Sequence, residues 1–225
     1  VGFLERISAN GRHLLDLINE VLDLAKIEAG RMELVLQDVD LGSVVRETLA
    51  QIEGQGRDRR LILRGEIPEG TTLLRTDPGK LRQVLINLLG NALKFTERGE
   101  VVVQVHTGPD GRTPVSISVK DTGIGIPGDR LKAIFEAFQQ ADGTTSRKYG
   151  GTGLGLTISR SLCQLLGYDL QVESELGRGS TFTILLTGEH TLPRRAEQEL
   201  MEEALRPIES SRPRAPASAE TQPGE

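Results

Sequence analysis

The stretch DPGKLRQVLINLLGNALKFT, residues 77–96, decides the fold because it predicts one helix with two unlike faces. Asp77 followed by Pro78 is typical of a helix start, since an N-cap side chain and a proline in the first turn both suit that position. Apolar residues then repeat at helical spacing and predict a buried face: Leu81, Val84, Leu85, Leu88, Leu89 and Ala92. The stretch therefore predicts a central helix packed against a larger body.

A polar row runs along the same predicted helix. Asn87, Asn91 and Lys94 follow at intervals of four and three residues, which places two carboxamides and an ammonium on one face. Carboxamide oxygens suit a hard cation such as Mg²⁺, and a lysine can neutralise a phosphate. Taken alone, the row is more typical of a solvated helix face; as a site, it predicts a magnesium nucleotide as ligand.

The segments around this helix predict a mixed α/β protein. Alternating apolar and polar residues predict strands, two of which a glycine-rich turn joins as an antiparallel hairpin. The predicted strands are 61–67, 72–75, 101–106, 115–119, 169–173 and 181–186, and further helices are predicted over 44–54, 129–138 and 154–166. The fold class is thus α/β, a two-layer α/β sandwich whose mixed, mostly antiparallel sheet carries helices on one face.

The two ends of the chain differ from this middle part. Residues 3–29 form an apolar stripe too wide for one neighbour, which predicts a long helix of a multi-helix bundle, with packing on its own domain as the alternative. From about residue 189 we expect a disordered tail, apart from a short helix near 197–205. The predicted domains are a bundle helix over 1–30, the sandwich over 36–188 and a tail over 189–225.

The composition of the chain argues against some binding partners and against disulfide bonds. The net charge of −5 argues against nonspecific attraction to nucleic acid, and the segment is expected to have no direct membrane contact. The single cysteine, Cys163, excludes an intrachain disulfide and favours a reducing, cytoplasmic setting. Because the chain begins at Val1 without an initiator Met, we expect it to be a piece of a longer protein.

A glycine pattern offers a different interpretation of the region after the hairpin. Gly123, Gly125 and Gly128 satisfy G-x-G-x-x-G, which is found in dinucleotide sites. Against that interpretation, Asp121 would face a pyrophosphate, and the predicted strands are antiparallel rather than joined by a parallel crossover.

Four segments together resemble the sequence boxes of sensor histidine kinases, most closely the hybrid members. NLLGNALKFT at 87–96, DTGIGIP at 121–127, IFEAFQQAD at 134–142 and GGTGLGL at 150–156 look like the asparagine, first glycine, phenylalanine and second glycine boxes. The stretch 14–30 resembles the second helix of that family's dimerisation and phosphoacceptor hairpin. The resemblance implies a GHKL-type ATPase fold with ATP and Mg²⁺ as cofactors.

The resemblance also implies roles for matching residues. Asn91 would ligate Mg²⁺, Asn87 would support the metal through its shell, and Lys94 would meet phosphate; these three are the catalytic candidates. Asp121 matches the adenine reader, and a carboxylate accepts the exocyclic amine of adenine but opposes the carbonyl of guanine. The other implied nucleotide contacts are Phe95, Gly123, Gly125, Ile126, Phe138, Arg147, Lys148, Gly151, Thr152, Gly153, Leu154, Gly155 and Thr181.

Expected roles can be given for the glycines after the hairpin, for the lid and for two phenylalanines. Gly123 and Gly125 are expected to let the backbone close over the base. The stretch 139–153 corresponds to the ATP lid, and the amides at its end open a helix, where N–H groups favour an anion. Phe135 and Phe138 are expected to pack in the core and to anchor the lid.

The acceptor histidine of the family has no match here. His13 aligns with the second hairpin helix, His106 lies in a predicted strand and His190 begins the tail. We therefore expect the chain to bind ATP without completing phosphotransfer. Asn87 stands where related ATPases carry a water-activating glutamate, and an amide cannot take a proton from water, so hydrolysis should be slow.

The resemblance implies the ATP-binding catalytic part of a two-component sensor histidine kinase. The reaction would transfer the γ-phosphoryl of ATP to a histidine, for relay to an aspartate of a response-regulator receiver domain. The intact protein is expected to be a homodimer in the cytoplasm, or the cytoplasmic part of a membrane-anchored sensor. The alternatives are a degenerate ATP-binding module without kinase activity, and an ATPase or protein-serine kinase of the same superfamily.

Overall fold

The computed structural model describes residues 2–56, 61–71, 73–137 and 153–186. They belong to the compact unit Val1–His190, and the second unit, Thr191–Glu225, lies outside the described residues. The predicted helix near 197–205 is therefore outside them as well. The domain boundaries given above stay predictions.

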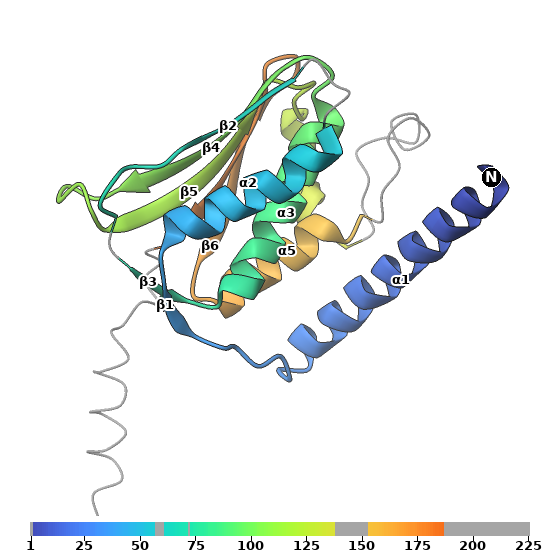
Figure 1. The fold of residues 1–225 in the computed structure, drawn as a ribbon, viewed down its shortest axis with the longest axis horizontal. Helices are drawn as coiled ribbons and strands as arrows, with labels where there is room; N and C mark the ends of the chain where they lie inside the picture. Colours follow the sequence, from blue (N-terminus) through green and yellow to red (C-terminus); the bar gives the residue numbers. More distant parts are fainter. Residues whose placement is uncertain (1, 57–60, 72, 138–152, 187–225) are drawn as a thin grey trace, which may run out of the picture. The chain divides into compact units, whose positions relative to one another are not determined.

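A five-stranded sheet forms one layer of the domain (Figure 1). Its strands, in spatial order, are β2 (Leu61–Glu66), β4 (Gly99–Thr107), β5 (Pro114–Asp121), β7 (Gly179–Leu185) and β6 (Asp169–Glu175). Only the β2–β4 pair is parallel; the other three neighbouring pairs of this sheet are antiparallel. The prediction of a mixed, mostly antiparallel sheet is confirmed.

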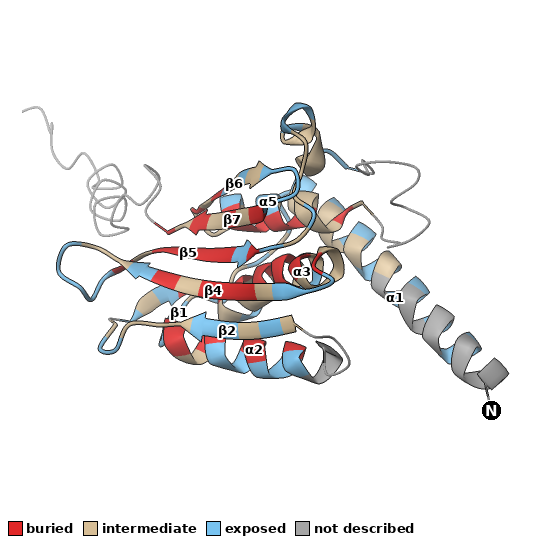
Figure 2. Ribbon diagram, turned by 90° about the horizontal axis from the view of Figure 1, so that it is seen from above, coloured by how far each residue is buried: buried red, intermediate tan, exposed pale blue. Residues whose placement is uncertain are grey.

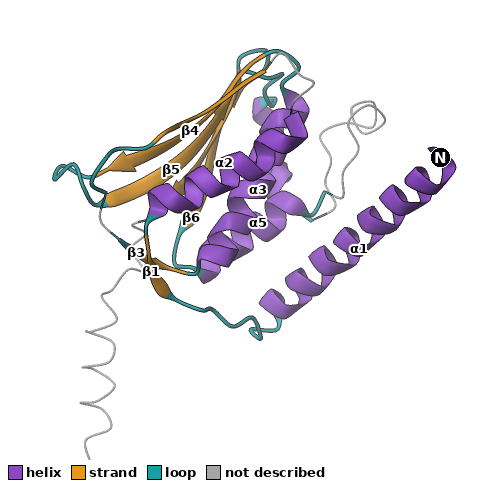
Figure 3. Ribbon diagram, in the orientation of Figure 1, coloured by secondary structure: helices purple, strands orange, loops and turns teal. Residues whose placement is uncertain are grey.

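Three helices form the second layer on one face of the sheet (Figure 3): α2 (Leu41–Gly56), α3 (Pro78–Phe95) and α5 (Gly155–Leu165). Helix α3 begins as predicted, because Asp77 Oδ1 accepts hydrogen bonds from the N–H groups of Gly79 and Lys80 at 2.9 and 3.0 Å. All six residues of its predicted apolar face are buried. The two-layer α/β sandwich is thereby confirmed.

The core lies between the helical layer and the sheet (Figure 2). In β4 and β5, Val103 pairs with Val119, and both side chains belong to this core. Because successive side chains of a strand point to opposite faces, the core face of β5 also includes Asp121, two residues further on. This alternation matters for the site, since it places Asp121 on the side of the helices.

A two-stranded ribbon accompanies the sheet and was not predicted in full. Strand β1 (Gln37–Val39) pairs antiparallel with β3 (Leu74–Thr76). The N-cap residue of α3 also bonds to the segment before β1, since Asp77 Oδ2 accepts a hydrogen bond from the Val35 N–H at 2.9 Å. Three residues carry too little alternation to predict a strand, which explains why β1 was missed.

Helix α1 (Gly2–Glu28) is a single long helix, as predicted. The helix ends at Glu28, and Gly30 follows with a φ of +63°, which allows the Arg31 N–H to reach the Lys26 carbonyl at 2.9 Å. Near this end, Leu24 and Ile27 pack against the core. Nearer its start, large apolar side chains are exposed: Ile7, Leu14, Leu15, Ile18, Val21 and Leu22.

None of the helices in the described part of the chain combines the length and the apolarity that crossing a membrane requires. The helix predicted over 129–138 is replaced by two short 3₁₀ turns, η1 (Gly128–Arg130) and η2 (Ala133–Phe135). The Glu136 N–H bonds to the Ala133 carbonyl at 3.0 Å, the i+3 spacing of such short turns. The prediction of an α-helix here was wrong.

Candidate functional site

The first half of the α3 polar row lies against α5. Asn87 Nδ2 donates a hydrogen bond to Ser159 Oγ at 2.7 Å. A Cβ atom added to Gly155, the first residue of α5, would lie 2.3 Å from Asn87 Oδ1. The carboxamide of Asn87 therefore lies at the start of α5, and Gly155 has no space for a side chain.

The other end of the row contacts the turn that follows β5. The Ile124 N–H donates to the Phe95 carbonyl at 3.3 Å, and a Cβ atom added to Gly123 would lie 2.4 Å from that carbonyl oxygen. The face of α3 between Asn87 and Phe95 spans about 12 Å at 1.5 Å per residue. It thus connects the start of α5 with the turn that carries Asp121, and Asn91 and Lys94 lie on this face.

Asp121 is the buried carboxylate of this region, with 6% of its surface exposed. Burial raises the pKa of the Asp121 carboxyl, although hydrogen bonds from the backbone N–H groups of Gly123 and Ser180 oppose the shift. The bond from Gly123 joins its N–H to Asp121 Oδ1 at 2.8 Å. These contacts fix the carboxyl group in one orientation, as recognition of a ligand's hydrogen-bond pattern requires.

The glycines of the turn are explained by packing within the protein. Gly125 has a φ of +69°, and a Cβ atom there would lie 2.1 Å from the Glu175 carbonyl oxygen. Next to it, the Ile126 N–H donates to Ser174 Oγ at 2.8 Å. The space left by Gly123 and Gly125 is therefore taken up by protein backbone. Their expected closure over a base stays a prediction.

The sheet register corrects one predicted site residue. Asp121 pairs with Ser180, whereas Thr181 pairs with Lys120. Because neighbouring residues of a strand face opposite sides, Thr181 lies on the side of the sheet away from Asp121. The residue beside Asp121 is Ser180. It was not predicted because the sequence does not show which residues of two neighbouring strands pair with each other.

Lys94 is half-buried near the end of α3. Burial lowers the pKa of its ammonium group, and Nζ lies 4.9 Å from the centroid of the Phe95 ring. Within the described ranges no carboxylate forms an ion pair with it. A partly desolvated ammonium interacts with an anion more strongly than one in bulk water does.

Helix α5 begins in a way that suits an anion. Gly153 has a φ of +73°, Leu154 is buried at the N-cap position, and no side chain of the described residues caps the first N–H groups. Such N–H groups and the helix dipole favour negative charge. The residues Phe138, Arg147, Lys148, Gly151 and Thr152, together with most of the predicted lid over 139–153, lie outside the described residues.

Phe135 connects η2 to α5. Its carbonyl accepts a hydrogen bond from Thr157 Oγ1 at 3.0 Å, and the Arg160 guanidinium lies 5.0 Å from its ring centroid. The side chain also packs against the core, which confirms the packing part of its predicted role. Its role as a lid anchor stays a prediction.

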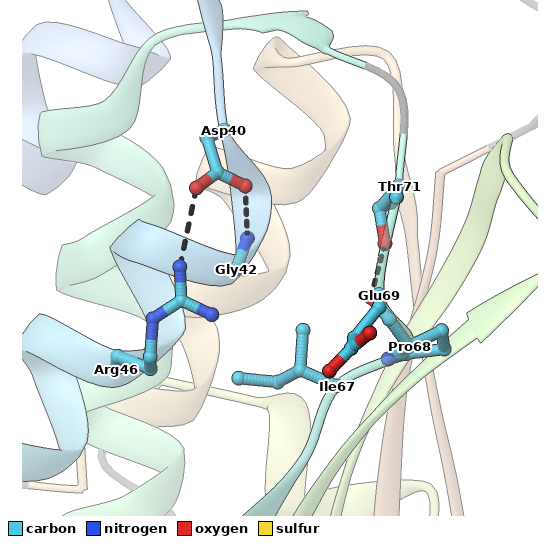
Figure 4. Close-up of a pocket in the computed structure, with 8 residues that line it drawn as sticks. Asp40, Gly42, Arg46, Ile67, Pro68, Glu69 and Thr71 are labelled. Carbon is cyan, nitrogen blue, oxygen red and sulfur yellow. Dashed lines mark hydrogen bonds and ion pairs between the residues drawn. The ribbon is translucent and has the colours of Figure 1, made fainter.

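Two other features are not part of this site. His106 is exposed on β4, and its Nε2 lies 3.0 Å from Ser118 Oγ on the face of the sheet away from the helices. A polar hollow at the start of α2 contains none of the predicted site residues (Figure 4). It is lined by Asp40, Gly42, Arg46, Ile67, Pro68, Glu69, Gly70 and Thr71.

The donor set restricts how a metal could be held. Among the residues that the structure describes, no group of three His, Cys, Asp or Glu side chains could bind a metal ion. The α3 row offers carboxamide oxygens instead, such as that of Asn91, and oxygens of this kind can bind a hard cation together with water and a ligand. Mg²⁺ suits such a set, since it keeps several waters and commonly binds together with substrate phosphates.

Comparison with known proteins gives a family match and close relatives. Residues 76–190 match the family described as histidine kinase-, DNA gyrase B- and HSP90-like ATPases. The chain is 39% identical over 190 residues to hybrid signal transduction histidine kinase B of Dictyostelium discoideum, covering 82% of this chain and 10% of that protein. It is 42% identical over 185 residues to the circadian input-output histidine kinase CikA of Synechococcus elongatus, covering 81% and 24%.

Solved structures agree with this fold. Full-length ShkA in complex with AMPPNP superposes with a TM-score of 0.71 at 34% identity, covering 81% of this chain and 37% of that one. The Acinetobacter baumannii histidine kinase AdeS superposes with a TM-score of 0.66 at 20% identity, covering 82% and 84%. The chain spans 10% and 24% of the lengths of the two curated relatives named above.

Proposed function

Because the chain belongs to the family of histidine kinase-, DNA gyrase B- and HSP90-like ATPases, we propose that it binds ATP with Mg²⁺ as the catalytic part of a hybrid sensor histidine kinase. The observation that carries this proposal is the contact between the turn after β5 and the end of α3. That contact joins a buried carboxylate, Asp121, to the polar row of α3. An adenine reader and a phosphate-binding surface then belong to one site.

Asp121 reads the adenine end of the nucleotide. Its carboxylate is held by backbone N–H groups, and it accepts the exocyclic amine of adenine. Guanine presents a carbonyl oxygen at the same position, where two acceptors would face each other without a proton between them. A buried group built for one hydrogen-bond pattern can reject the wrong base by up to ~10⁴-fold.

Asn91, Lys94 and the start of α5 bind the phosphate end. The carboxamide oxygen of Asn91 ligates Mg²⁺, the Lys94 ammonium neutralises phosphate, and the N–H groups at the start of α5 receive an anion. When bound, Mg²⁺ supplies charge neutralisation at the phosphates. The chain's residues hold the phosphates in position, and positioning is a large part of how proteins catalyse phosphoryl transfer.

The γ-phosphoryl acceptor is a histidine on the partner helix of a dimerisation hairpin, of which α1 is the second helix. The exposed apolar residues of α1 form the surface that this hairpin and a second copy of the protein cover. The names of the curated relatives support relay to a receiver domain, since they include hybrid histidine kinases. Asn87 in place of a general base keeps hydrolysis slow, so the phosphoryl group is kept for the acceptor.

Nucleotide titration tests the proposal. ATP affinity is measured by displacement of a fluorescent ATP analogue, in Mg²⁺ and in EDTA, for the unchanged chain, Asn91→Ala and the matched control Asn19→Ala on the exposed surface of α1. We expect Mg²⁺-dependent binding that Asn91→Ala abolishes and Asn19→Ala leaves unchanged, with all three chains folded by circular dichroism. Unchanged affinity in Asn91→Ala would remove the metal assignment, and rapid ATP hydrolysis would favour an ATPase instead.

A further inference from the structure

A buried hydroxyl on α5 contacts the α3 polar row directly. Ser159 has 1% of its surface exposed, and its Oγ accepts the hydrogen bond from Asn87 Nδ2 at 2.7 Å. We propose that Ser159 is a positioning residue, which holds the Asn87 carboxamide with its oxygen turned toward Gly155 at the start of α5. This inference rests on the proposed function, because it assigns the residue that orients one of the proposed metal-site groups.

The orientation of a carboxamide decides whether it presents a hydrogen-bond acceptor or a donor to a neighbouring charge. Its oxygen is an acceptor and its NH₂ group is a donor, so rotation by 180° exchanges the two at the same position. In the observed orientation the NH₂ group of Asn87 is taken up by Ser159, while Oδ1 faces Gly155. When Mg²⁺ is bound, an oxygen there would accept a hydrogen bond from a water of the metal, whereas an NH₂ group would turn its protons toward the cation.

Gly155 and Ser159 act from the same side of α5. They are four residues apart, so they lie on one helix face, one turn from each other. Gly155 leaves the space that Asn87 Oδ1 occupies, since a Cβ atom would lie 2.3 Å from it. Ser159 supplies the hydroxyl that holds the carboxamide by its NH₂ group in that space.

The inference is specific to Ser159 among the serines of α5. Ser161 lies two residues further along the same helix and is half-buried, and a helix turns by about 200° over two residues, so it faces away from Asn87. Ser161→Ala is therefore a matched control that removes the same atom from the same helix. Ser159→Thr keeps the hydroxyl and is the rescue variant.

The test measures how strongly Mg²⁺ enhances ATP affinity, expressed as the ratio of dissociation constants in EDTA and in Mg²⁺. We expect Ser159→Ala to lower this ratio about tenfold, as loss of a group that orients a metal-site residue commonly does. Ser159→Thr and Ser161→Ala should keep it. In an Asn87→Ala chain, Ser159→Ala should have no additional effect, because the group that Ser159 orients is gone.

The outcomes separate this inference from the proposed function. If the unchanged chain shows no Mg²⁺-dependent ATP binding, the proposed function fails and the inference with it. If the unchanged chain binds as proposed but Ser159→Ala keeps its Mg²⁺ enhancement, or acts equally in the Asn87→Ala chain, only the inference is overturned. Should Ser159→Ala fail to fold, Ser159→Cys gives the same comparison with a weaker acceptor.

Discussion

Helices α1 and α3 have similar apolar periodicity and opposite surroundings. In α3, Leu85 has 0% of its surface exposed, because the helix packs against the sheet and has a neighbouring helix on each side. In α1, Leu14 has 59% exposed, and only residues near the end of the helix, such as Leu24, pack against the core. The comparison teaches that periodicity predicts a helix and the face it must bury, but not whether the same domain covers that face.

The polar faces of the two helices differ as well. In α3 the polar row lies between α5 and the turn after β5, where Asn87 hydrogen-bonds within the protein. In α1, Asp23 contacts the domain through its carboxylate, which accepts a hydrogen bond from Gln83 Nε2 at 2.9 Å. Gln83 lies four residues before Asn87, so the same face of α3 meets α1 at one end and the proposed nucleotide site at the other.

The largest expected effect concerns the buried face of α3. Leu85→Ala should lower the free energy of unfolding by about 2–5 kcal/mol, because it removes a fully buried side chain and leaves a cavity. Urea unfolding followed by circular dichroism measures this change.

The matched variant in α1 is Leu14→Ala. Since most of that side chain is exposed, we expect a change within about 0.5 kcal/mol when the chain is monomeric. A loss comparable to that of Leu85→Ala would mean that this part of α1 is buried in the free chain, and the contrast between the helices would not hold.

A second prediction concerns the buried carboxyl group at the end of the α3 row. The pKa of Asp121 is raised in the folded state, so the folded chain binds more protons than the unfolded chain between the ordinary aspartate pKa of 3.8 and the raised value. The stability contributed by Asp121 is therefore present below pH 3.8 and is lost as pH rises through the folded pKa.

It follows that Asp121→Asn, which keeps an acceptor for the Gly123 N–H, should unfold at a higher temperature than the unchanged chain at pH 7. The difference should shrink as pH falls into the acid range. ATP affinity of the same variant should fall by about tenfold or more, since a neutral amide accepts the adenine amine less strongly. Thermal unfolding at several pH values checks the first result, and a variant less stable than the unchanged chain at pH 7 would contradict it.

The smallest expected effect concerns the contact between the two helices. Gln83→Ala and Asp23→Ala should each lower the free energy of unfolding by about 0.5–1.5 kcal/mol, the usual range for one hydrogen bond. The double variant should lose less than the sum, because both changes remove the same bond. Fully additive losses would show that Asp23 and Gln83 do not interact in solution.

Long elements with strong periodicity were predictable from the sequence. Helix α3 was predicted from its N-cap to its buried face, and the β4–β5 hairpin from alternation and its turn. Strand β1 and the 3₁₀ turns after Pro127 were not, because segments of three residues carry almost no periodic signal.

The site was predictable where one element carries it and not where several elements meet. Asn87, Asn91 and Lys94 share one helix, so their common face follows from spacing alone. The pairing of Asp121 with Ser180 rather than Thr181 depends on register, and the contact of Asn87 with Ser159 depends on how two helices pack. The close approach of Gly125 to the Glu175 carbonyl could not be predicted either, because Glu175 belongs to a strand far away in the sequence.

Competition between ATP and GTP tests the central claim, that one site reads adenine through Asp121 and holds phosphates on the α3 row. Calorimetric titrations of the unchanged chain with each nucleotide in Mg²⁺ should show ATP binding at least ten times more tightly, with the preference reduced in Asp121→Asn. Equal affinities for ATP and GTP in the unchanged chain would contradict the claim.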